Sequence, residues 1–361
     1  MDLGVRQAGF EVLADIEMDP YCCETLRSAI ARENLNTQVL NQDIRKVEPL
    51  NLRKQLSLNI GELDLLFGGS PCQSFSQAGK RASLDDERGM LIFEFIRFAD
   101  VFQPKFIIIE QVKGFLTAPD QAEQIGGVCR IVTSELKKLG YEVQIEIINA
   151  ANYGVAQYRE RVFLVAHHQG MSFKFPPPTH GKTNQQLCLF PLQPYLNLGQ
   201  ALAGLGSPSK DKEHPPEDSH LDITPPGDIM RIHGVPEGSF LAKEKHLPEQ
   251  QRGKLTKKDT TKFRRLSVSE PSLTLRCGEI FFHPREDRYL TPREYMRLHG
   301  YPDDYFLKGP IRGRSGTARH LDQHRQVANS VPPPVARAIA AEVAKSLQSQ
   351  ILAKAISAGD R

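Results

Sequence analysis

The sequence lacks the features that would place it in a membrane or outside the cell. It contains no apolar run of about eighteen residues, which excludes a membrane-spanning helix. The first residues, MDLGVR, show no basic segment followed by an apolar one, so we expect no export signal. We therefore expect a cytoplasmic protein with reduced thiols.

Paired cysteines and a strong net charge are also missing. None of the 6 cysteines forms a C-x-x-C pair, which excludes a zinc ribbon and a thioredoxin-like site. The net charge of +3 is too small to indicate nucleic-acid binding, so the distribution of charge has to be considered. With 361 residues and 40% hydrophobic content, the chain can build one large core or two ordinary ones.

The first half of the chain alternates apolar runs with amphipathic segments. This pattern predicts strands at 11–17, 63–67, 106–109, 141–148 and 162–166, and helices at 21–31, 92–102 and 127–139. Strands that alternate with helices predict an α/β fold with a mostly parallel sheet covered on both faces. In such sheets ligands bind at the carboxyl ends of the strands.

The pattern stops after residue 175, in a stretch rich in proline and glycine. Residues 243–265 contain nine basic and three acidic side chains, a local net charge of +6. This segment is either a solvated loop or a surface that contacts phosphates. Regular structure is predicted again at 291–298, with Thr291 as N-cap, and in an amphipathic helix at 333–358.

Three segments at predicted strand ends carry reactive side chains. Cys72 follows Gly68-Gly69-Ser70-Pro71 and is either an exposed nucleophile or an inert buried thiol. Glu110 ends the strand FIII and is either a proton donor, its pKa raised by burial, or part of a cap or salt bridge. Arg159 and Arg161 lie on one side of an extended segment, where they hold a carbonyl or carboxylate or form a surface ladder.

Taken in order, these segments resemble the C5-cytosine DNA methyltransferase family over nearly the whole chain. The matching segments are Pro71-Cys72-Gln73, Glu110-Gln111-Val112, Gln157-x-Arg159-x-Arg161, Arg288 to Glu294 with Leu298 to Pro302, and Gln326 to Pro333. The resemblance implies a Rossmann-like sheet for S-adenosylmethionine, with a smaller target-recognition domain inserted before the C-terminal helix. It divides the chain into a catalytic domain (1–174), a recognition domain with a hinge (175–325) and a returning helix (326–361).

The resemblance also implies catalytic roles. Cys72 adds to C6 of a cytosine flipped out of the duplex, Glu110 stabilises the adduct at ring N3, and Arg159 holds the base carbonyl oxygen. The implied catalytic residues are Pro71, Cys72, Gln73, Glu110, Gln157, Arg159 and Arg161. Methyl transfer from S-adenosylmethionine to C5 yields S-adenosylhomocysteine.

Cofactor and DNA contacts are implied in the same way. Glu17 matches the acid that holds the ribose hydroxyls and Asp43 the acid near the adenine amine, with Ile44, Asn329 and Ser330 beside them. The residues expected to contact DNA are Lys80, Arg81, Arg88, Arg264, Arg265 and Arg276. We expect a monomer that acts on double-stranded DNA in a bacterial cytoplasm at the nucleoid, alongside a cognate restriction endonuclease.

Three departures from the family pattern bear on these expectations. The family opens with Phe-x-Gly-x-Gly-Gly, and Met1 aligns just after it, so the first strand and glycine loop are expected to be absent. We expect a start further upstream, the alternative being a truncated chain that binds cofactor poorly. Gln111 replaces an Asn, and Ala328 replaces a Gly, which is a mild change if its backbone angles are ordinary.

Four other functions are alternatives to this one. A non-catalytic DNA-binding relic is supported only by the absent glycine loop. An RNA methyltransferase of the same fold would carry a Cys-Phe-Thr tripeptide, which the sequence lacks. A cysteine hydrolase would need a histidine partner such as His167, His168 or His180. Methylation at N4 would need a Ser/Asp-Pro-Pro-aromatic motif.

Overall fold

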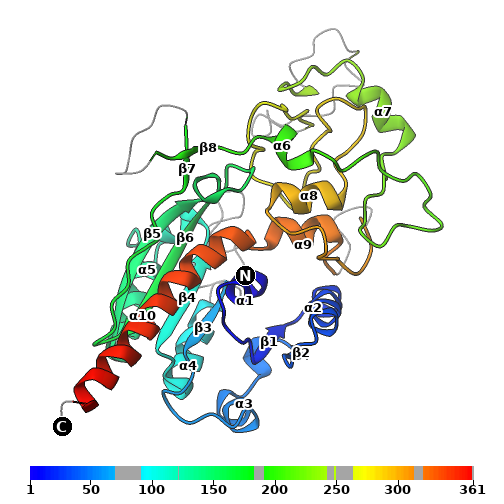
Figure 1. Ribbon diagram of the computed structural model, residues 1–361. Coiled ribbons are helices and arrows are strands. Elements are labelled where there is room, and N and C mark those ends of the chain that lie inside the picture. The colour runs from blue at the N-terminus through cyan, green and yellow to red at the C-terminus, as the bar shows by residue number, and fades with distance from the viewer. Residues whose placement is uncertain are drawn as a thin grey trace.

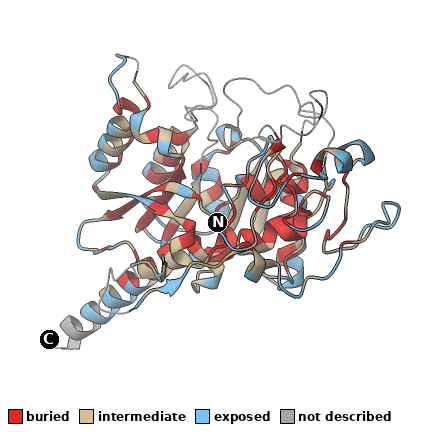
Figure 2. Ribbon diagram, turned by 90° about the horizontal axis from the view of Figure 1, so that it is seen from above, coloured by how far each residue is buried: buried red, intermediate tan, exposed pale blue. Residues whose placement is uncertain are grey.

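The computed structural model of the chain describes residues 1–69, 91–120, 122–182, 191–241, 248, 263–312 and 320–359, with side chains as far as residue 353. It contains a sheet-based first lobe and a second lobe of short helices and loops (Figure 1). The second lobe is defined here as residues 191–329. Figure 2 shows buried residues in both lobes, along the strands of the first and among the short helices of the second.

Four strands form the main sheet, in the order β3-β4-β6-β5. Their bounds are Leu65–Gly69 (β3), Phe106–Gln111 (β4), Tyr141–Asn149 (β5) and Glu160–His168 (β6). β3 and β4 are parallel, but β6 is antiparallel to both β4 and β5. The prediction of a mostly parallel sheet is therefore wrong for β6 only, because β5 runs in the same direction as β3 and β4. Residues 150–159 between β5 and β6 contain only the short helix η4 (Ala150–Tyr153), too little chain for the crossover that parallel strands require.

Helices cover both faces of this sheet. Phe106 and Ile108 of β4 pack in the cluster that contains α10 (Pro333–Gly359), whereas Ile107 and Ile109 pack with α4 (Ile92–Phe102) and α5 (Gly127–Lys138). Successive side chains of a strand point to opposite faces, so the apolar run FIII is buried on both. α10 returns along the sheet beside α1 (Asp2–Gln7), as Figure 1 shows.

A second, two-stranded parallel sheet holds the N-terminal part of the first lobe. It pairs β1 (Ala14–Glu17) with β2 (Gln38–Asn41), which α2 (Pro20–Arg32) connects. The short helix η1 (Ile44–Lys46) and α3 (Pro49–Gln55) follow, and their apolar side chains pack against α4. The strand predicted from residue 11 begins at Ala14, and β2 had not been predicted because its four residues are too few to show a period.

Short helices and long loops make up the second lobe. Its regular elements are β8 (Gln193–Pro194), α6 (Leu198–Leu202), α7 (Pro226–Ile232), α8 (Pro292–Leu298) and α9 (Gln323–Asn329); β8 pairs with β7 (His180–Gly181). A separate apolar cluster fills this lobe, with Leu290, Tyr295 and Leu298 at its centre. The predicted cap of α8 is confirmed: Thr291 accepts from the N–H of Glu294, and Glu294 accepts from the N–H of Thr291.

The C-terminal helix agrees with its prediction to within one residue. Val335, Ile339 and Val343 bury the apolar stripe of α10 against β4 and β6. Within the described ranges, no helix has the length and apolar character needed to cross a membrane.

Candidate catalytic site at the edge of the main sheet

The carboxyl ends of β3 and β4 bring a glycine and a carboxylate together. Gly69 pairs with Glu110 across the two parallel strands. A Cβ atom on Gly69 would lie 2.9 Å from a carboxylate oxygen of Glu110, so only glycine leaves room for that group. Glu110 therefore lies where the sequence GGSPC leaves the sheet.

The Glu110 carboxylate is buried against an arginine. The residue is 9% exposed, and its Oε1 lies 2.9 Å from Nε of Arg161. Burial raises the pKa of Glu110, while the positive charges of Arg161 and Arg159 act in the opposite direction. The raised pKa fits the first alternative from the sequence, a proton donor, and the contact with Arg161 is the salt bridge of the second, so the catalytic role of Glu110 stays a prediction. A carboxyl group that keeps its proton more readily than an exposed one, beside a fixed cation, can serve as a general acid.

Arg159 makes a different set of contacts, although it too acts on Glu110 electrostatically. Its side chain is buried, and Nη2 donates to the carbonyls of Ala328 (2.9 Å) and Ser330 (3.0 Å). These contacts tie β6 to the junction of α9 and α10. The role of Arg159 at the base carbonyl stays a prediction, and Arg161 is the arginine in direct contact with Glu110.

Gln157 joins the two lobes. Its Oε1 accepts from the N–H of Leu275 at 3.0 Å, and its Nε2 lies 2.9 Å from Nδ1 of His299. The backbones of Ala156 and Ser272 pair beside it, with the N–H of Ser272 donating to the carbonyl of Ala156 at 2.8 Å. His299 was missed from the sequence, although it lies between two residues of a recognised segment, Leu298 and Gly300.

Two carboxylates lie at the ends of the parallel strands β1 and β2. Glu17 ends β1, accepts from the N–H of Asp19 at 2.7 Å, and has its pKa raised by burial. Asp43 caps η1 and pairs with Arg45 at 2.6 Å, which lowers the pKa of Asp43. Met18, next to Glu17, exposes 64% of its surface. Two acids that can accept from hydroxyls and an amine, beside an exposed apolar side chain, fit an adenosine group.

The remaining predicted cofactor residues have structural contacts. The carbonyl of Ile44 accepts from Arg97 at 2.8 Å. Asn329 is exposed and its Oδ1 accepts from the thiol of Cys277 at 2.8 Å, a contact that sequence reasoning did not find. The Ser330 hydroxyl donates to the carbonyl of Val327 at 2.9 Å. Their place at a cofactor stays a prediction.

The predicted DNA-contacting arginines lie in three different environments. Arg265 is buried, donating to the carbonyl of Ile232 at 3.1 Å and to Asp287. Arg264 is half-buried, with its guanidinium 5.2 Å from the centre of the Phe240 ring. Arg276 is exposed next to Leu275 and is the one of the three best placed to reach a ligand.

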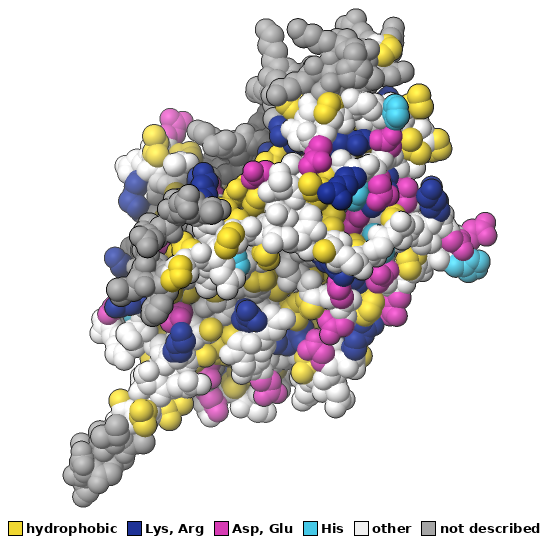
Figure 3. All heavy atoms as spheres, turned by 45° about the horizontal axis from the view of Figure 1, so that its top comes forward, with side chains coloured by type: hydrophobic (Ala, Val, Ile, Leu, Met, Phe, Trp, Pro, Cys, Tyr) yellow, Lys and Arg dark blue, Asp and Glu magenta, His cyan; other side chains and the backbone are white. Residues whose placement is uncertain are grey.

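Several predicted residues lie outside the described ranges. They are Pro71, Cys72, Gln73, Lys80, Arg81 and Arg88, together with most of the basic segment at 243–265. On the face in Figure 3, the described Lys and Arg side chains are interspersed with Asp and Glu instead of forming one patch. In the part of the chain with described side chains, no group of His, Cys, Asp and Glu is arranged to hold a metal ion.

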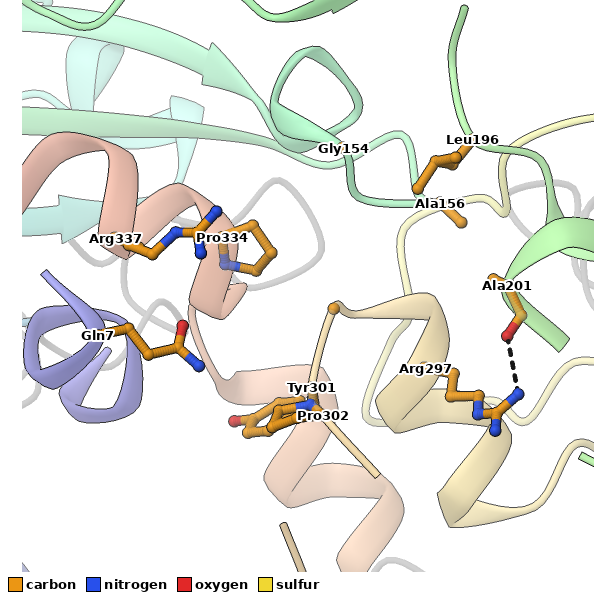
Figure 4. Close-up of a pocket in the computed structure, with 11 residues that line it drawn as sticks. Gln7, Gly154, Ala156, Leu196, Ala201, Arg297, Tyr301, Pro302, Pro334 and Arg337 are labelled. Atoms are coloured by element: carbon orange, nitrogen blue, oxygen red, sulfur yellow. Dashed lines mark hydrogen bonds between the residues drawn. The ribbon is translucent and has the colours of Figure 1, made fainter. Parts of the chain in front are cut away.

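A hollow of about 310 Å³ lies away from Glu110, where α1, α8 and α10 meet. In Figure 4, Arg337 and Gln7 lie on one side of it and Arg297 on the other, turned toward the carbonyl of Ala201. Its lining residues are Gln7, Gly154, Ala156, Leu196, Ala201, Arg297, Gly300, Tyr301, Pro302, Pro334 and Arg337. None of them carries the chemistry at the sheet edge.

Comparison with known proteins agrees with this geometry. The family model for C-5 cytosine-specific DNA methylases matches residues 1–345. Type II methyltransferase M.NgoFVII of Neisseria gonorrhoeae is 31% identical over 342 residues, covering 92% of this chain and 80% of that protein. Type II methyltransferase M1.HphI of Haemophilus parahaemolyticus is 31% identical over 347 residues, covering 95% and 83%.

The fold is also that of a solved structure. A prophage-encoded protein of Escherichia coli, described as a DNA modification methyltransferase, superposes with a TM-score of 0.69 at 19% identity, covering 96% of this chain and 95% of that one. This likeness confirms the predicted α/β methyltransferase fold. The chain therefore belongs to the family of C-5 cytosine-specific DNA methylases and is a DNA (cytosine-5-)-methyltransferase.

Proposed function

We propose that this chain methylates C5 of a cytosine flipped out of a specific double-stranded DNA sequence, as the modification enzyme of a restriction-modification system. The observation that carries the proposal is the buried Glu110–Arg161 pair, which faces Gly69 at the sheet edge. Cys72 follows Gly69 by three residues, which span at most about 11 Å of chain. In our proposal the thiol of Cys72 and the carboxyl of Glu110 act together at this edge.

The two groups suit the chemistry of cytosine. C5 is a weak nucleophile inside a base stack, and flipping the base out costs a few kcal/mol. In our proposal the Cys72 thiolate forms a bond to C6 while Glu110 shares its proton with ring N3, so that C5 becomes enamine-like. S-adenosylmethionine, when bound, supplies the methyl group. Loss of the C5 proton and departure of Cys72 then restore the aromatic ring.

The contacts of the two arginines divide their roles. Arg161 touches Glu110, so we assign it to the base side of the pair, where it stabilises negative charge on the carbonyl oxygen. Arg159 donates to Ala328 and Ser330, so we assign it to holding the α9–α10 junction against β6. This differs from the role that the resemblance implied for Arg159.

The cofactor and DNA assignments follow from position. Glu17 and Asp43, at the ends of β1 and β2, would hold the ribose hydroxyls and the adenine amine of S-adenosylmethionine. Arg276, exposed beside the Leu275–Gln157 contact, would reach the DNA near the flipped base. We further propose that the protein acts as a monomer in the bacterial cytoplasm, and that a separate endonuclease cuts the same DNA sequence.

The test is transfer of labelled methyl groups from S-adenosylmethionine to unmethylated DNA. We expect label in 5-methylcytosine with the native chain and none with Cys72→Ser, while both bind DNA equally. Cys129→Ser is the matched control, because Cys129 lies on α5 and should leave the rate unchanged. Transfer that persists in Cys72→Ser would refute the mechanism. A native chain that binds DNA without transfer would favour the non-catalytic alternative, and label in RNA alone would favour the RNA enzyme.

A further inference from the structure

An unbroken series of hydrogen bonds runs from the second lobe to the carbonyl that Arg159 contacts. The N–H of Leu275 donates to Oε1 of Gln157, and Nε2 of Gln157 donates to Nδ1 of His299. Nε2 of His299 lies 3.1 Å from the carbonyl oxygen of Ser330, and Nη2 of Arg159 donates to the same oxygen at 3.0 Å. We call this series the Gln157–His299 relay.

Each bond in the relay has only one possible direction. The Leu275 N–H can only donate, so it fixes the Gln157 amide with its oxygen toward Leu275 and its NH₂ group toward His299. His299 must then accept at Nδ1 and donate from Nε2 to the Ser330 carbonyl, which defines one neutral tautomer. His299 is 0% exposed, and burial holds its pKa well below the usual range, with the positive charge of Arg159 adding to the shift. The ring therefore stays in this neutral form.

The relay crosses between the lobes three times, from Leu275 to Gln157, back to His299 and on to Ser330. Leu275 and His299 belong to the second lobe, whereas Gln157 leads directly into Arg159 and Arg161 at the start of β6. Ser330 lies at the entry to α10. A movement of the segment around Leu275 must therefore shift Gln157 or break the relay, and a shift of Gln157 moves the backbone that carries both arginines.

We propose that His299 is a positioning residue that transmits the docking of the second lobe on DNA to the Glu110–Arg161 pair. The inference rests on the proposed function, because it assigns the second lobe to DNA. Arg276, exposed next to Leu275, is the side chain through which DNA would act on the relay. His299 itself touches neither Glu110 nor Arg161 in the described structure, so it acts only through its neighbours.

The first test compares two substitutions of His299 in the full-length protein. His299→Leu fills the space but makes no hydrogen bond, and we expect kcat for methyl transfer to fall at least about 10-fold with KM for DNA within about 3-fold. His299→Gln offers an amide oxygen and an NH₂ group in place of Nδ1 and Nε2, and should stay within about 3-fold of the native kcat. Full activity of His299→Leu, or an equal loss in both variants, would overturn the inference.

A second pair of variants guards against simple destabilisation. Gln157→Met should reproduce the loss in kcat, and the double variant with His299→Leu should be no slower than the slower single one, since either change already breaks the relay. Additive losses would mean independent structural roles. His220→Leu is the control: His220 is also buried in the second lobe and bonded to Thr291 and the Gly206 carbonyl, but it lies outside the relay. It should lose thermal stability and keep kcat.

A spectroscopic measurement keeps this inference distinct from the proposed function. In ¹⁵N spectra of the histidine rings, His299, identified by the signal missing in His299→Gln, should show protonated Nε2 and a hydrogen-bonded Nδ1. Adding duplex DNA should shift these signals in the native chain but not in Gln157→Met. An inactive native chain would refute the proposed function alone, whereas the absence of a DNA-dependent shift would refute the relay whether or not the chain is active.

Discussion

Glu110 at the end of β4 and Glu294 in the first turn of α8 are both buried glutamates that face an arginine, yet their surroundings differ. Glu294 is 2% exposed and receives two bonds from Arg288, at 2.7 and 2.8 Å, and one from the N–H of Thr291. Among the described residues, Glu110 meets Arg161 at a single 2.9 Å contact and faces Gly69 on its other side. The carboxylate of Glu294 thus has its hydrogen-bonding positions occupied, whereas that of Glu110 can still bond to a ligand.

This difference supports our proposal that the Glu294–Arg288 pair is structural and that Glu110 takes part in the reaction. Glu294 accepts from both terminal nitrogens of Arg288 and from the N–H of Thr291, and these bonds hold the start of α8. The single contact at Glu110 does not outweigh burial, so its pKa is raised. The number of hydrogen-bond donors around each buried carboxylate is thus consistent with the roles that we propose, and each lobe offers a way to test the distinction.

We expect the largest effect, a loss of stability, when the Arg288–Glu294 pair is broken. Arg288→Met removes the bidentate partner of Glu294 and the 2.9 Å contact to Glu286, leaving two carboxylates without their cation. We expect the free energy of unfolding to fall by about 3–5 kcal/mol in urea titrations, the usual cost of breaking a buried pair. Adding Glu294→Gln should recover part of this loss, because Gln at that position still caps Thr291. A cost below about 1 kcal/mol would contradict the structural role of the pair.

At Glu110 we expect the opposite outcome, a loss of rate without a loss of stability. Glu110→Gln should lower kcat about 100-fold, which corresponds to about 2.7 kcal/mol. Because burial raises the pKa of Glu110, the working protonated form is present at low pH and is lost as pH rises through the raised value. The native rate should therefore decline on that side of the pH profile, and the variant should lack this decline.

The raised pKa of Glu110 also predicts how the stability of the fold depends on pH. A carboxyl whose pKa is raised by folding stabilises the folded state below its ordinary pKa and loses that contribution as pH rises through the raised one. The melting temperature of Glu110→Gln, measured relative to that of the native chain, should therefore increase as pH rises. A variant with native kcat, or one that melts like Arg288→Met, would assign Glu110 to structure after all.

The sequence predicted the first lobe far better than the second, for a physical reason. Runs such as FIII, and the aromatic spacing of 92–102, are direct consequences of burial on a sheet or a helix face, so α4 and β4 match their predictions closely. The antiparallel placement of β6 was not predicted, because strand direction depends on the length of the connection and not on the apolar pattern. The capped α8 was predicted because its cap is local in sequence.

The second lobe is held by contacts that no local pattern encodes. Arg293 is buried and donates to the carbonyls of Asp218 and Tyr305, 75 and 12 residues away. Arg265, which the resemblance places among the DNA-contacting residues, is bonded to Asp287, a contact that the sequence did not indicate. The same holds for the site. Motif order located Glu110 and Arg161, but the different roles that we propose for Arg159 and Arg161 depend on the contact of Arg159 with Ser330, about 170 residues further on.

The smallest effect concerns the joint between the two lobes, at Gly300 after α8. Its φ is +83°, and a Cβ atom there would lie 2.7 Å from the ring of Pro334 at the start of α10. Gly300→Ala should therefore cost about 1–2 kcal/mol of unfolding free energy, from the left-handed backbone and the clash together. Gly204 separates the two causes, because its φ is +75° but a Cβ would meet no atom within 4 Å. Gly204→Ala should therefore cost only the part due to the left-handed backbone. Equal losses of unfolding free energy in the two variants would mean that Pro334 moves aside at no cost, so that its packing against Gly300 does not hold the two lobes rigidly together.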